Sequence, residues 1–366
     1  MKRYVCLYPF NQITISYDGK VIACNLDWPE LMEMGSLKND SLLDIYYNQK
    51  YESFRYMHAN GNPQYMCEFC GGVASNIFRG DIEPYININK IQNITESQLS
   101  FFVVLELSLA CTCICKHCVR SKDLERYPTI EKGYNQFLMK PEMLKLALSQ
   151  LDEFLKEKDR TAVVMLHWRG ESFLNPLIGT ACEQLISNPR IKSLILDTNL
   201  QALTKDKIFQ FLKQIKWPLA KHSNFDFHLS FSLDATNKDS YDKIRIGGDF
   251  ELAKANALAF LEQRNALEIL QLRFSFQFIV EPYNWDYTQD FINYWESRID
   301  IKLDDIYIKR CHGRWEFTDL IPKIYSKTIK RFKLIEQAKK KPYLTLDIDE
   351  NKYFVQKENS VFKYED

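Results

Sequence analysis

FFVVLELSLACTCICKHC, residues 101–118, joins an apolar run to a cluster of cysteines. The run Phe101–Leu109 predicts a buried strand because almost every residue in it is apolar. Four cysteines follow within residues 111–118. A single cysteine packs as a small apolar side chain, but four in one loop indicate a metal centre. The stretch therefore predicts a strand that presents several thiols at its carboxyl end.

Three of these cysteines have the spacing C-x3-C-x2-C: Cys111, Cys115 and Cys118. Three thiolates on a [4Fe–4S] cluster leave one iron without a protein ligand. That iron can bind a small molecule, as the open position of a catalytic metal does. Cys113 lies outside this spacing, and we expect that it is not a ligand.

The motif, with His117 before its last cysteine, resembles the signature of the radical S-adenosylmethionine (SAM) superfamily. The resemblance implies that the amino and carboxylate groups of SAM chelate the open iron. It also implies that the reduced cluster cleaves SAM to a 5′-deoxyadenosyl radical, with electrons from a donor such as flavodoxin or ferredoxin. The fold it implies is α/β: a partial (β/α)6 barrel of the TIM type.

The composition excludes several classes of partner. The chain of 366 residues has a formal net charge of zero, so no basic surface favours nucleic acid. The sequence shows no secretory signal and no apolar run long enough to span a membrane. Ten cysteines in such a chain indicate thiolate ligands in a reducing compartment, and we expect a cytoplasmic protein with no membrane partner.

A second group of cysteines precedes the strand. Cys6 and Cys24 flank a predicted hairpin whose turn contains Asp18-Gly19, and Cys67 and Cys70 form a C-x2-C pair. An amphipathic helix is predicted between the two pairs, from Ser41 to about Ala59. Four thiolates make a closed site without an open position, so the site is structural or transfers electrons. The residues alone allow either zinc or a [4Fe–4S] cluster.

This pattern resembles the SPASM/twitch extension of radical SAM enzymes. The further cysteines of a full SPASM module are missing after Cys70, so the shorter twitch version fits better. In that context we expect one auxiliary [4Fe–4S] cluster rather than zinc. The module follows the barrel in most relatives, whereas here it precedes the barrel.

From residue 101 onward, strand and helix patterns alternate, which predicts parallel strands. The predicted strands are Phe101–Leu109, Ala162–Trp168, Ser193–Thr198, Asp226–Leu233, Leu272–Val280 and Asp305–Lys309. The helix expected to begin at Asn175-Pro176 has Asn175 as its cap, another begins after Thr204, and a single helix is expected from Asn237 to about Arg264. The predicted domains are an auxiliary-cluster module (1–79), a linker (80–100), the barrel (101–315) and a C-terminal helix with short strands (316–366).

Several motifs fall at the predicted carboxyl ends of the strands, where barrels of this kind carry their active sites. The resemblance implies that eight residues contact SAM or lie beside it: His117, Gly170, Glu171, Thr198, Asn199, Ser232, Asp234 and Arg245. Arg245 suits the SAM carboxylate because a guanidinium fork matches a carboxylate. The family usually has Gly-Gly-Glu where this chain has Arg169-Gly170-Glu171.

Two remaining cysteines have different expected roles. Cys182 has helical spacing with apolar neighbours and is expected to pack in the core. Cys311 ends the last predicted strand, where it can donate a hydrogen atom to a substrate radical, serve as a spare cluster ligand, or simply be buried. A hydrogen donor at this position predicts epimerisation, and electron transfer to the auxiliary cluster predicts oxidation.

The substrate class follows from what the chain lacks. We expect no fused peptide-recognition domain, which favours a small hydroxylated substrate such as a sugar or cyclitol derivative. A ribosomally made peptide is the alternative substrate, for a maturase or an epimerase. The non-enzyme alternative is an iron–sulfur electron carrier or a zinc-stabilised binding protein, and it predicts no binding of SAM.

Overall fold

The computed structural model describes residues 8–59, 67, 100–130, 133–311 and 321–347. Its main sheet has ten strands in the order β12-β11-β10-β8-β7-β6-β4-β1-β2-β3. The strands are β1 (Gln12–Ile15), β2 (Lys20–Ile22), β3 (Glu33–Ser36), β4 (Phe101–Leu105), β6 (Ala162–Met165), β7 (Ile191–Thr198), β8 (Asp226–Ser232), β10 (Leu272–Val280), β11 (Asp305–Arg310) and β12 (Leu344–Leu346).

The six strands predicted for the barrel all form, and they lie side by side in chain order. Each pairs in parallel with its neighbour, from β4 and β6 through to β10 and β11. The sheet remains open, since its two edge strands in the described part of the chain are β12 and β3. The predicted partial (β/α)6 barrel is therefore confirmed, with β12 as one further parallel strand.

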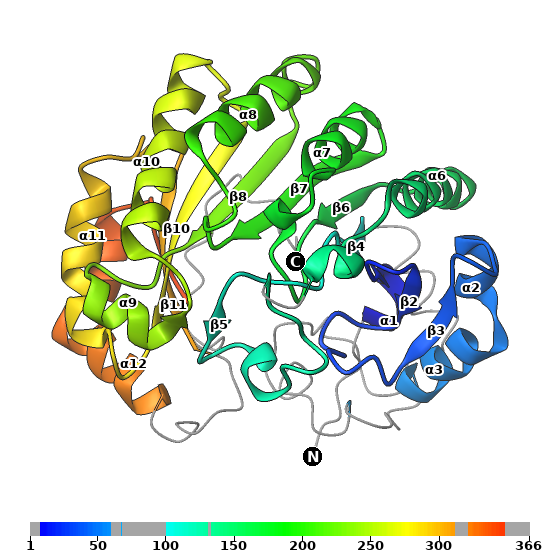
Figure 1. Cartoon of the computed structure of the whole chain (residues 1–366), viewed down its shortest axis with the longest axis horizontal. Helices are drawn as coiled ribbons and strands as arrows, with labels where there is room; N and C mark the ends of the chain where they lie inside the picture. Colours follow the sequence, from blue (N-terminus) through cyan, green and yellow to red (C-terminus); the bar gives the residue numbers. More distant parts are fainter. Residues whose placement is uncertain (1–7, 60–66, 68–99, 131–132, 312–320, 348–366) are drawn as a thin grey trace.

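The long helices cover one side of the sheet, and β5 lies on the other side (Figure 1). Apolar residues on alternate positions of the strands face these helices, as Phe231 and Phe274 do with ring centroids 4.9 Å apart. The helices are α1 (Tyr8–Asn11), α2 (Leu42–Tyr47), α3 (Gln49–Ala59), α6 (Pro141–Glu157), α7 (Ile178–Ser187), α8 (Lys205–Ala220), α9 (Lys238–Ile244), α10 (Phe250–Ala266), α11 (Thr288–Glu296), α12 (Ile321–Arg331) and α13 (Leu334–Lys340).

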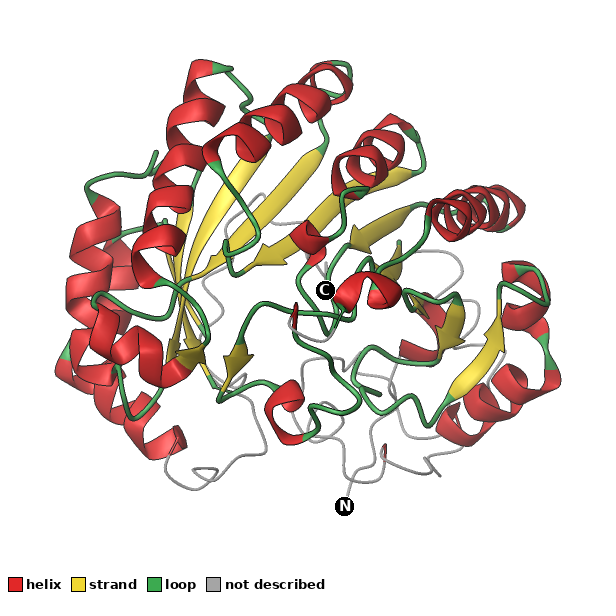
Figure 2. Ribbon diagram, in the orientation of Figure 1, coloured by secondary structure: helices red, strands yellow, loops and turns green. Residues whose placement is uncertain are grey.

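The predicted N-terminal hairpin forms as β1 and β2, with Gly19 at a φ of 90° in the turn. β1 also pairs in parallel with β4, with Ile13 opposite Val103. The hairpin and β3 thus extend the barrel sheet, so the cysteine module is joined to the barrel by backbone hydrogen bonds (Figure 2). The domain boundaries themselves remain a prediction.

Two predicted helices are each divided in the structure. The helix expected over Ser41–Ala59 breaks at Asn48, whose side chain bonds the backbone of Met34 and Tyr51 instead of continuing the helix. The helix expected over 237–264 ends at Ile244, because the next two residues form strand β9 (Arg245–Ile246). Gly247 follows at a φ of 85°, and Asp249 caps a new helix, α10.

Of two predicted helix caps, one is confirmed and the other is wrong. Thr204 caps α8 as predicted, because its hydroxyl accepts a hydrogen bond from Lys207 N. The cap predicted at Asn175 is wrong, since α7 begins at Ile178. The Asn175 amide instead donates to the carbonyls of Leu107 and Met139, and it thereby ties this loop to the end of β4.

Candidate active site and metal centre

The cysteine loop is fixed to a segment 130 residues away in sequence. Its strand β5 (Ile114–Cys115) pairs antiparallel with β9 (Arg245–Ile246), and Cys115 lies opposite Arg245. Lys116 N also donates to Ile244 O at 2.9 Å. The pairing places the predicted cluster ligands beside the predicted carboxylate-binding arginine, as the resemblance requires.

All four thiols of the loop meet in one buried group. Cys111, Cys113 and Cys115 are at most 9% exposed and form a cluster against which Cys118 packs. Two side chains donate to the sulfurs: Asn199 Nδ2 lies 3.3 Å from Cys111 Sγ, and Arg245 Nη1 lies 3.5 Å from Cys115 Sγ. Donors of this kind tune an iron–sulfur centre, so the loop's surroundings suit one.

The protonation of the thiols differs along the loop. Burial raises the pKa of Cys111 to about 11 and that of Cys118 to about 12. The pKa of Cys115 is lowered to about 6, because Cys113 donates a hydrogen bond to it and Arg245 lies close by. Metal ligands must be thiolates, so binding a cluster here would release protons from Cys111 and Cys118.

The donor set fits a cluster better than a single ion. Within the described residues, no three His, Cys, Asp or Glu side chains converge on one point suitable for a metal ion. A [4Fe–4S] cluster is larger, and its thiolates bind separate irons at separate corners. The structure brings Cys113 into the same group, so the choice of Cys111, Cys115 and Cys118 as the ligands remains a prediction.

Arg245 is held by Asp234 at the end of β8. Nε and Nη2 of Arg245 lie 2.9 Å and 2.5 Å from Asp234 Oδ2, and both residues are buried. The other carboxylate oxygen of Asp234 accepts Ile279 N at 2.7 Å. The fully buried carboxylate of Asp234 therefore orients Arg245. The expected contact of Asp234 with SAM or the substrate stays a prediction.

Glu171 links the loops after β6 and β7. Its carboxylate accepts hydrogen bonds from Thr198 Oγ1 at 2.9 Å, Asn199 N at 2.8 Å and Phe173 N at 3.1 Å. Burial raises its pKa to about 6, against these hydrogen bonds, which lower it. Three of the predicted residues, Glu171, Thr198 and Asn199, thus form one network that ends on Cys111 and Thr112.

Gly170 lies where no side chain fits. A Cβ atom at this position would lie 2.1 Å from Ser108 O and 2.5 Å from Ala110 O. Glu171 N donates to Ala110 O at 2.8 Å, so the two loops lie directly against each other. Gly170 therefore allows a close contact with the backbone that leads into the cysteine loop.

Arg169, which replaces the usual glycine, is buried and joins three segments. It makes a fork with Glu106, at 2.9 Å from Nε to Oε1 and 2.6 Å from Nη2 to Oε2. Its Nη1 lies 2.6 Å from Glu30 Oε1 and donates to Trp28 O. The neighbouring Trp168 donates to Asn25 O at 2.6 Å. The loop that carries Gly170 therefore contacts the segment that follows Cys24.

His117 pairs with Glu281, which follows β10. His117 Nδ1 lies 2.5 Å from Glu281 Oε1, and both side chains are largely buried. Burial lowers the pKa of His117, but the hydrogen bond and charge of Glu281 outweigh it, and the net shift is upward. His117 is thus held in place between the third and fourth cysteines of the loop, Cys115 and Cys118.

The auxiliary site is only partly described. Cys6 and Cys70 lie outside the described residues, whereas Cys24 and Cys67 are both half-buried. Cys67 Sγ lies 4.0 Å from Met32 Sδ, and Met32 O accepts from Ala23 N, next to Cys24. The structure therefore brings two of the four predicted ligands to one region.

Two further predicted residues lie at the same edge of the sheet. Ser232 ends β8 and is half-buried, opposite Gln277. Cys311 directly follows β11 and is buried. Its predicted roles are not distinguished by this position. Cys182 is fully buried in α7, which confirms its predicted place in the core.

Several residues of the site were missed in the sequence: Glu106, Arg120, Glu281 and Asn284. Glu106 carried a usable signal, since a carboxylate within an apolar strand must find a buried partner. Arg120 is 2% exposed and donates to the carbonyls of Leu109 and Pro128, which closes the cysteine loop. No local pattern identifies such an arginine, because its partners are fixed by the loop's final shape.

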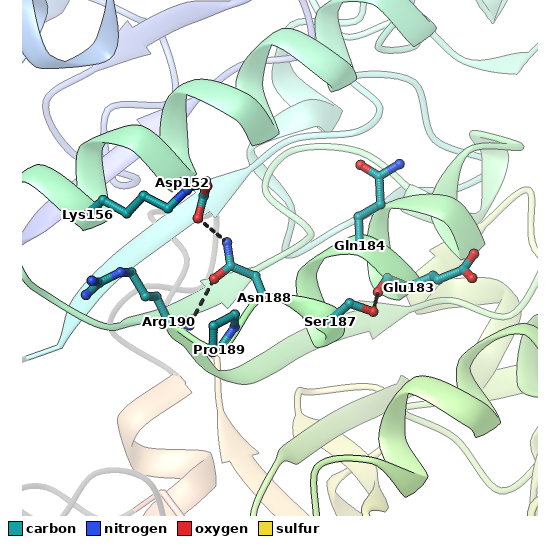
Figure 3. Close-up of a pocket in the computed structure, with 8 residues that line it drawn as sticks. All are labelled: Asp152, Lys156, Glu183, Gln184, Ser187, Asn188, Pro189 and Arg190. Atoms are coloured by element: carbon teal, nitrogen blue, oxygen red, sulfur yellow. Dashed lines mark hydrogen bonds and ion pairs between the residues drawn. The ribbon is translucent and has the colours of Figure 1, made fainter.

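The hollow drawn in Figure 3 belongs to a different part of the molecule. It lies between the end of α6 and the residues that lead into β7, at the amino ends of the strands. Its polar side chains bond one another, as Asn188 does with Asp152 at 2.8 Å. Catalytic residues of such barrels lie at the opposite end, so we assign this hollow no role.

Parts of the chain are similar to known proteins. Residues 6–71 match SPASM, an iron–sulfur cluster-binding domain. A 71-residue stretch is 31% identical to the S-adenosyl-L-methionine-dependent 2-deoxy-scyllo-inosamine dehydrogenase of Niallia circulans, and it covers 19% of this chain and 28% of that relative. Among solved structures, BtrN in complex with AdoMet and 2-DOIA has 13% sequence identity and a TM-score of 0.30, with 58% of this chain and 70% of that chain covered.

The match to SPASM and the aligned stretch confirm the predicted resemblance to radical SAM proteins with a SPASM-type module. The N-terminal part of the chain is similar to an iron–sulfur cluster-binding domain, as its cysteine spacing predicted. The aligned stretch spans little more than a quarter of the relative's length. No helix in the described part of the chain is long and apolar enough to cross a lipid bilayer.

Proposed function

We propose that this protein is a radical SAM enzyme that oxidises a small hydroxylated substrate, such as a cyclitol, by dehydrogenation. When bound, the reduced cluster and SAM supply a 5′-deoxyadenosyl radical that removes a hydrogen atom from an unactivated C–H bond. The observation that carries the proposal is the pairing of β5 with β9, which joins the cysteine loop to Arg245. The predicted cluster ligands and the predicted carboxylate-binding arginine thus lie on two paired strands.

The chain's own residues have separable tasks in this proposal. Cys111, Cys115 and Cys118 would hold the SAM-binding cluster, and Cys6, Cys24, Cys67 and Cys70 the auxiliary cluster. Arg245, oriented by Asp234, binds the carboxylate of SAM. The backbone at Gly170 and the network of Glu171, Thr198 and Asn199 support the amino-acid part of SAM from below. A reducing cytoplasm and a donor such as flavodoxin or ferredoxin suit this chemistry.

Oxidation is favoured over other outcomes by two observations. The relative with the aligned stretch is named as a dehydrogenase of a cyclitol amine. The contact of the SPASM-matching segment with Arg169, next to Gly170, also supports a role of the auxiliary cluster in the reaction. Loss of a hydrogen atom, the hydroxyl proton and one electron converts an alcohol to a ketone, and the auxiliary cluster, held by Cys6, Cys24, Cys67 and Cys70, would supply the acceptor of that electron.

Epimerisation is the second candidate, and the burial of Cys311 at the carboxyl end of β11 supports it. A thiol there would return a hydrogen atom to the substrate carbon. A peptide substrate remains an alternative for either reaction, with the same core residues. The two reactions are separated by product: a ketone from oxidation, or solvent deuterium in an otherwise unchanged substrate from epimerisation.

The test uses protein reconstituted anaerobically with iron and sulfide. About eight irons per chain are expected for two [4Fe–4S] clusters, and 5′-deoxyadenosine should form after dithionite is added. A variant with Cys111, Cys115 and Cys118 replaced by Ala should keep the auxiliary iron and form no deoxyadenosine. Tightly held zinc without deoxyadenosine would contradict the proposal and favour a binding protein.

A further inference from the structure

A cluster of polar side chains on the inner face of the sheet lies outside the network of Glu171, Thr198 and Asn199. Leu194 and Leu196 of β7 point into the core against the helices, so the intervening and following residues, including Asp197, face the other side. Asp197 lies opposite Ser230 of β8 in the strand register. Its side chain is 30% exposed although β7 is an inner strand, so the inner face is open at this point.

His167 is locked against this aspartate. Asp197 N donates to His167 Nδ1 at 3.0 Å, and His167 Nε2 lies 3.2 Å from Asp197 Oδ2. A ring nitrogen that accepts a hydrogen bond carries no proton, so the neutral imidazole has its proton on Nε2, toward the carboxylate. Burial lowers the pKa of His167, which agrees with a neutral ring. Asp197 is thereby oriented without being neutralised.

Lys309 of β11 supplies the opposing charge. Although burial raises it, the pKa of Asp197 is held below its ordinary value by the charge of Lys309 and a hydrogen bond from Ser230. Lys309 lies on the inner face of the sheet, as Asp197 does, because it alternates along β11 with Ile306 and Ile308, which are buried in the core against the helices. One layer deeper, Nε2 of His228 is buried and has no hydrogen-bond partner among the described residues.

We propose that Asp197 and Lys309, with His167 and Ser230 in support, form the substrate-binding site and bind a small polyol through its hydroxyl groups. One hydroxyl donates to the Asp197 carboxylate, and a second accepts from the Lys309 ammonium. The two charges balance each other, so the site suits hydroxyl groups rather than a phosphate or a carboxylate. This inference rests on the proposed function, and it adds to that function the residues that bind the substrate.

The site lies at the right end of the strands. His167 follows β6, Asp197 is the penultimate residue of β7, and Lys309 is the penultimate residue of β11. Thr198 and Asn199, directly after Asp197, belong to the network beside Cys111. Asp197 therefore lies at the same strand end as the network beside Cys111. Hydrogen abstraction requires the substrate to lie close to bound SAM, and this strand end meets that requirement.

The test is binding without turnover. Reconstituted protein with SAM, and without dithionite, is titrated by calorimetry with 2-deoxy-scyllo-inosamine and separately with scyllo-inositol. Native protein should bind at least one of them, and Asp197→Asn and Lys309→Met should each weaken that binding about tenfold or more. Asp290→Asn, on the outer helix α11, is the control for the loss of one carboxylate and should bind as the native protein does.

Two further readouts keep the outcomes apart. Both variants should bind SAM as the native protein does, and circular dichroism checks that they fold. Native-like polyol binding by both variants, loss of SAM binding in Asp197→Asn, or binding of neither probe by native protein would each overturn the site assignment. Absence of deoxyadenosine from the native protein would instead overturn the proposed function, while the binding result would still decide the polyol site.

Discussion

Arg169 forms a two-pronged ion pair with Glu106, and both side chains are buried. Burial raises the pKa of Glu106, while the charge and hydrogen bonds of Arg169 act to lower it. The same guanidinium reaches Glu30 and Trp28 in the SPASM-matching segment. A residue that departs from the family motif therefore ties the auxiliary-cluster module to the loop that carries Gly170.

Replacing Arg169 tests this connection. Arg169→Ala leaves the carboxylate of Glu106 buried and unpaired, which costs about 3–5 kcal/mol in the free energy of unfolding. Arg190→Ala removes a surface ion pair with the largely exposed Asp159 and should cost about 1 kcal/mol or less. Denaturant unfolding of the three proteins measures both. Equal, small losses for the two variants would show that Arg169 is not a structural junction.

The same variant also tests the functional side of that junction. Arg169→Lys keeps the charge but cannot form the fork with Glu106 while also reaching Glu30. We expect this variant to keep full iron content and to cleave SAM. Cleavage should no longer be coupled to substrate oxidation, so that deoxyadenosine forms with little oxidised product. Iron analysis and the ratio of deoxyadenosine to product measure this. An unchanged ratio would limit Arg169 to stability.

Gly170 provides a test of the loop contact. In Gly170→Ala the new methyl group would overlap Ser108 O and Ala110 O, which are backbone atoms with little freedom to move. The two loops must separate, so we expect loss of the SAM-binding cluster with the auxiliary cluster retained. Gly133→Asn is the control, because Gly133 has a φ of 65° in open space and asparagine tolerates that conformation. Iron content near native in both variants would contradict the prediction.

The local sequence pattern was sufficient to predict the helices and strands of the fold. It was not sufficient to predict which side chains contact each other in the site. Alternating apolar residues predicted β7, β8, β10 and their helices, because each faces a single core. Pairings such as His117 with Glu281 join residues 164 positions apart, and no local period encodes them. The parallel pairing of β1 with β4 escaped prediction for the same reason: both read as ordinary strands, and their neighbours are set by the whole sheet.

The cysteine assignment is tested by single substitutions. Cys113→Ser should retain the SAM-cleaving cluster, and Cys115→Ser should lose it, because only Cys115 belongs to the C-x3-C-x2-C spacing. Cys182→Ala, in the core of α7, controls for loss of a buried thiol. Iron content and the electron paramagnetic resonance spectrum of the reduced protein, with and without SAM, are the measurements. Loss of the SAM-sensitive signal in Cys113→Ser would reverse the assignment.

His58 gives the fold a pH dependence that is separate from the metal chemistry. Burial at the end of α3 lowers its pKa to about 4, from an ordinary value of 6.5, and its Nε2 has no hydrogen-bond partner among the described residues. The unfolded chain therefore binds a proton that the folded chain does not, between pH 6.5 and about 4. Stability is full above pH 6.5 and falls as the pH decreases through this window.

Between pH 7.5 and 5.5, His58 should lower the free energy of unfolding by about 1 kcal/mol. His58→Phe keeps the aromatic packing against Phe54, whose ring centroid lies 4.6 Å away, and removes the titrating group. Denaturant unfolding of native protein and variant at both pH values isolates the effect, because every other titrating group is common to the two. The native protein should lose more stability than the variant on acidification. An equal loss would mean that His58 is not held neutral by burial.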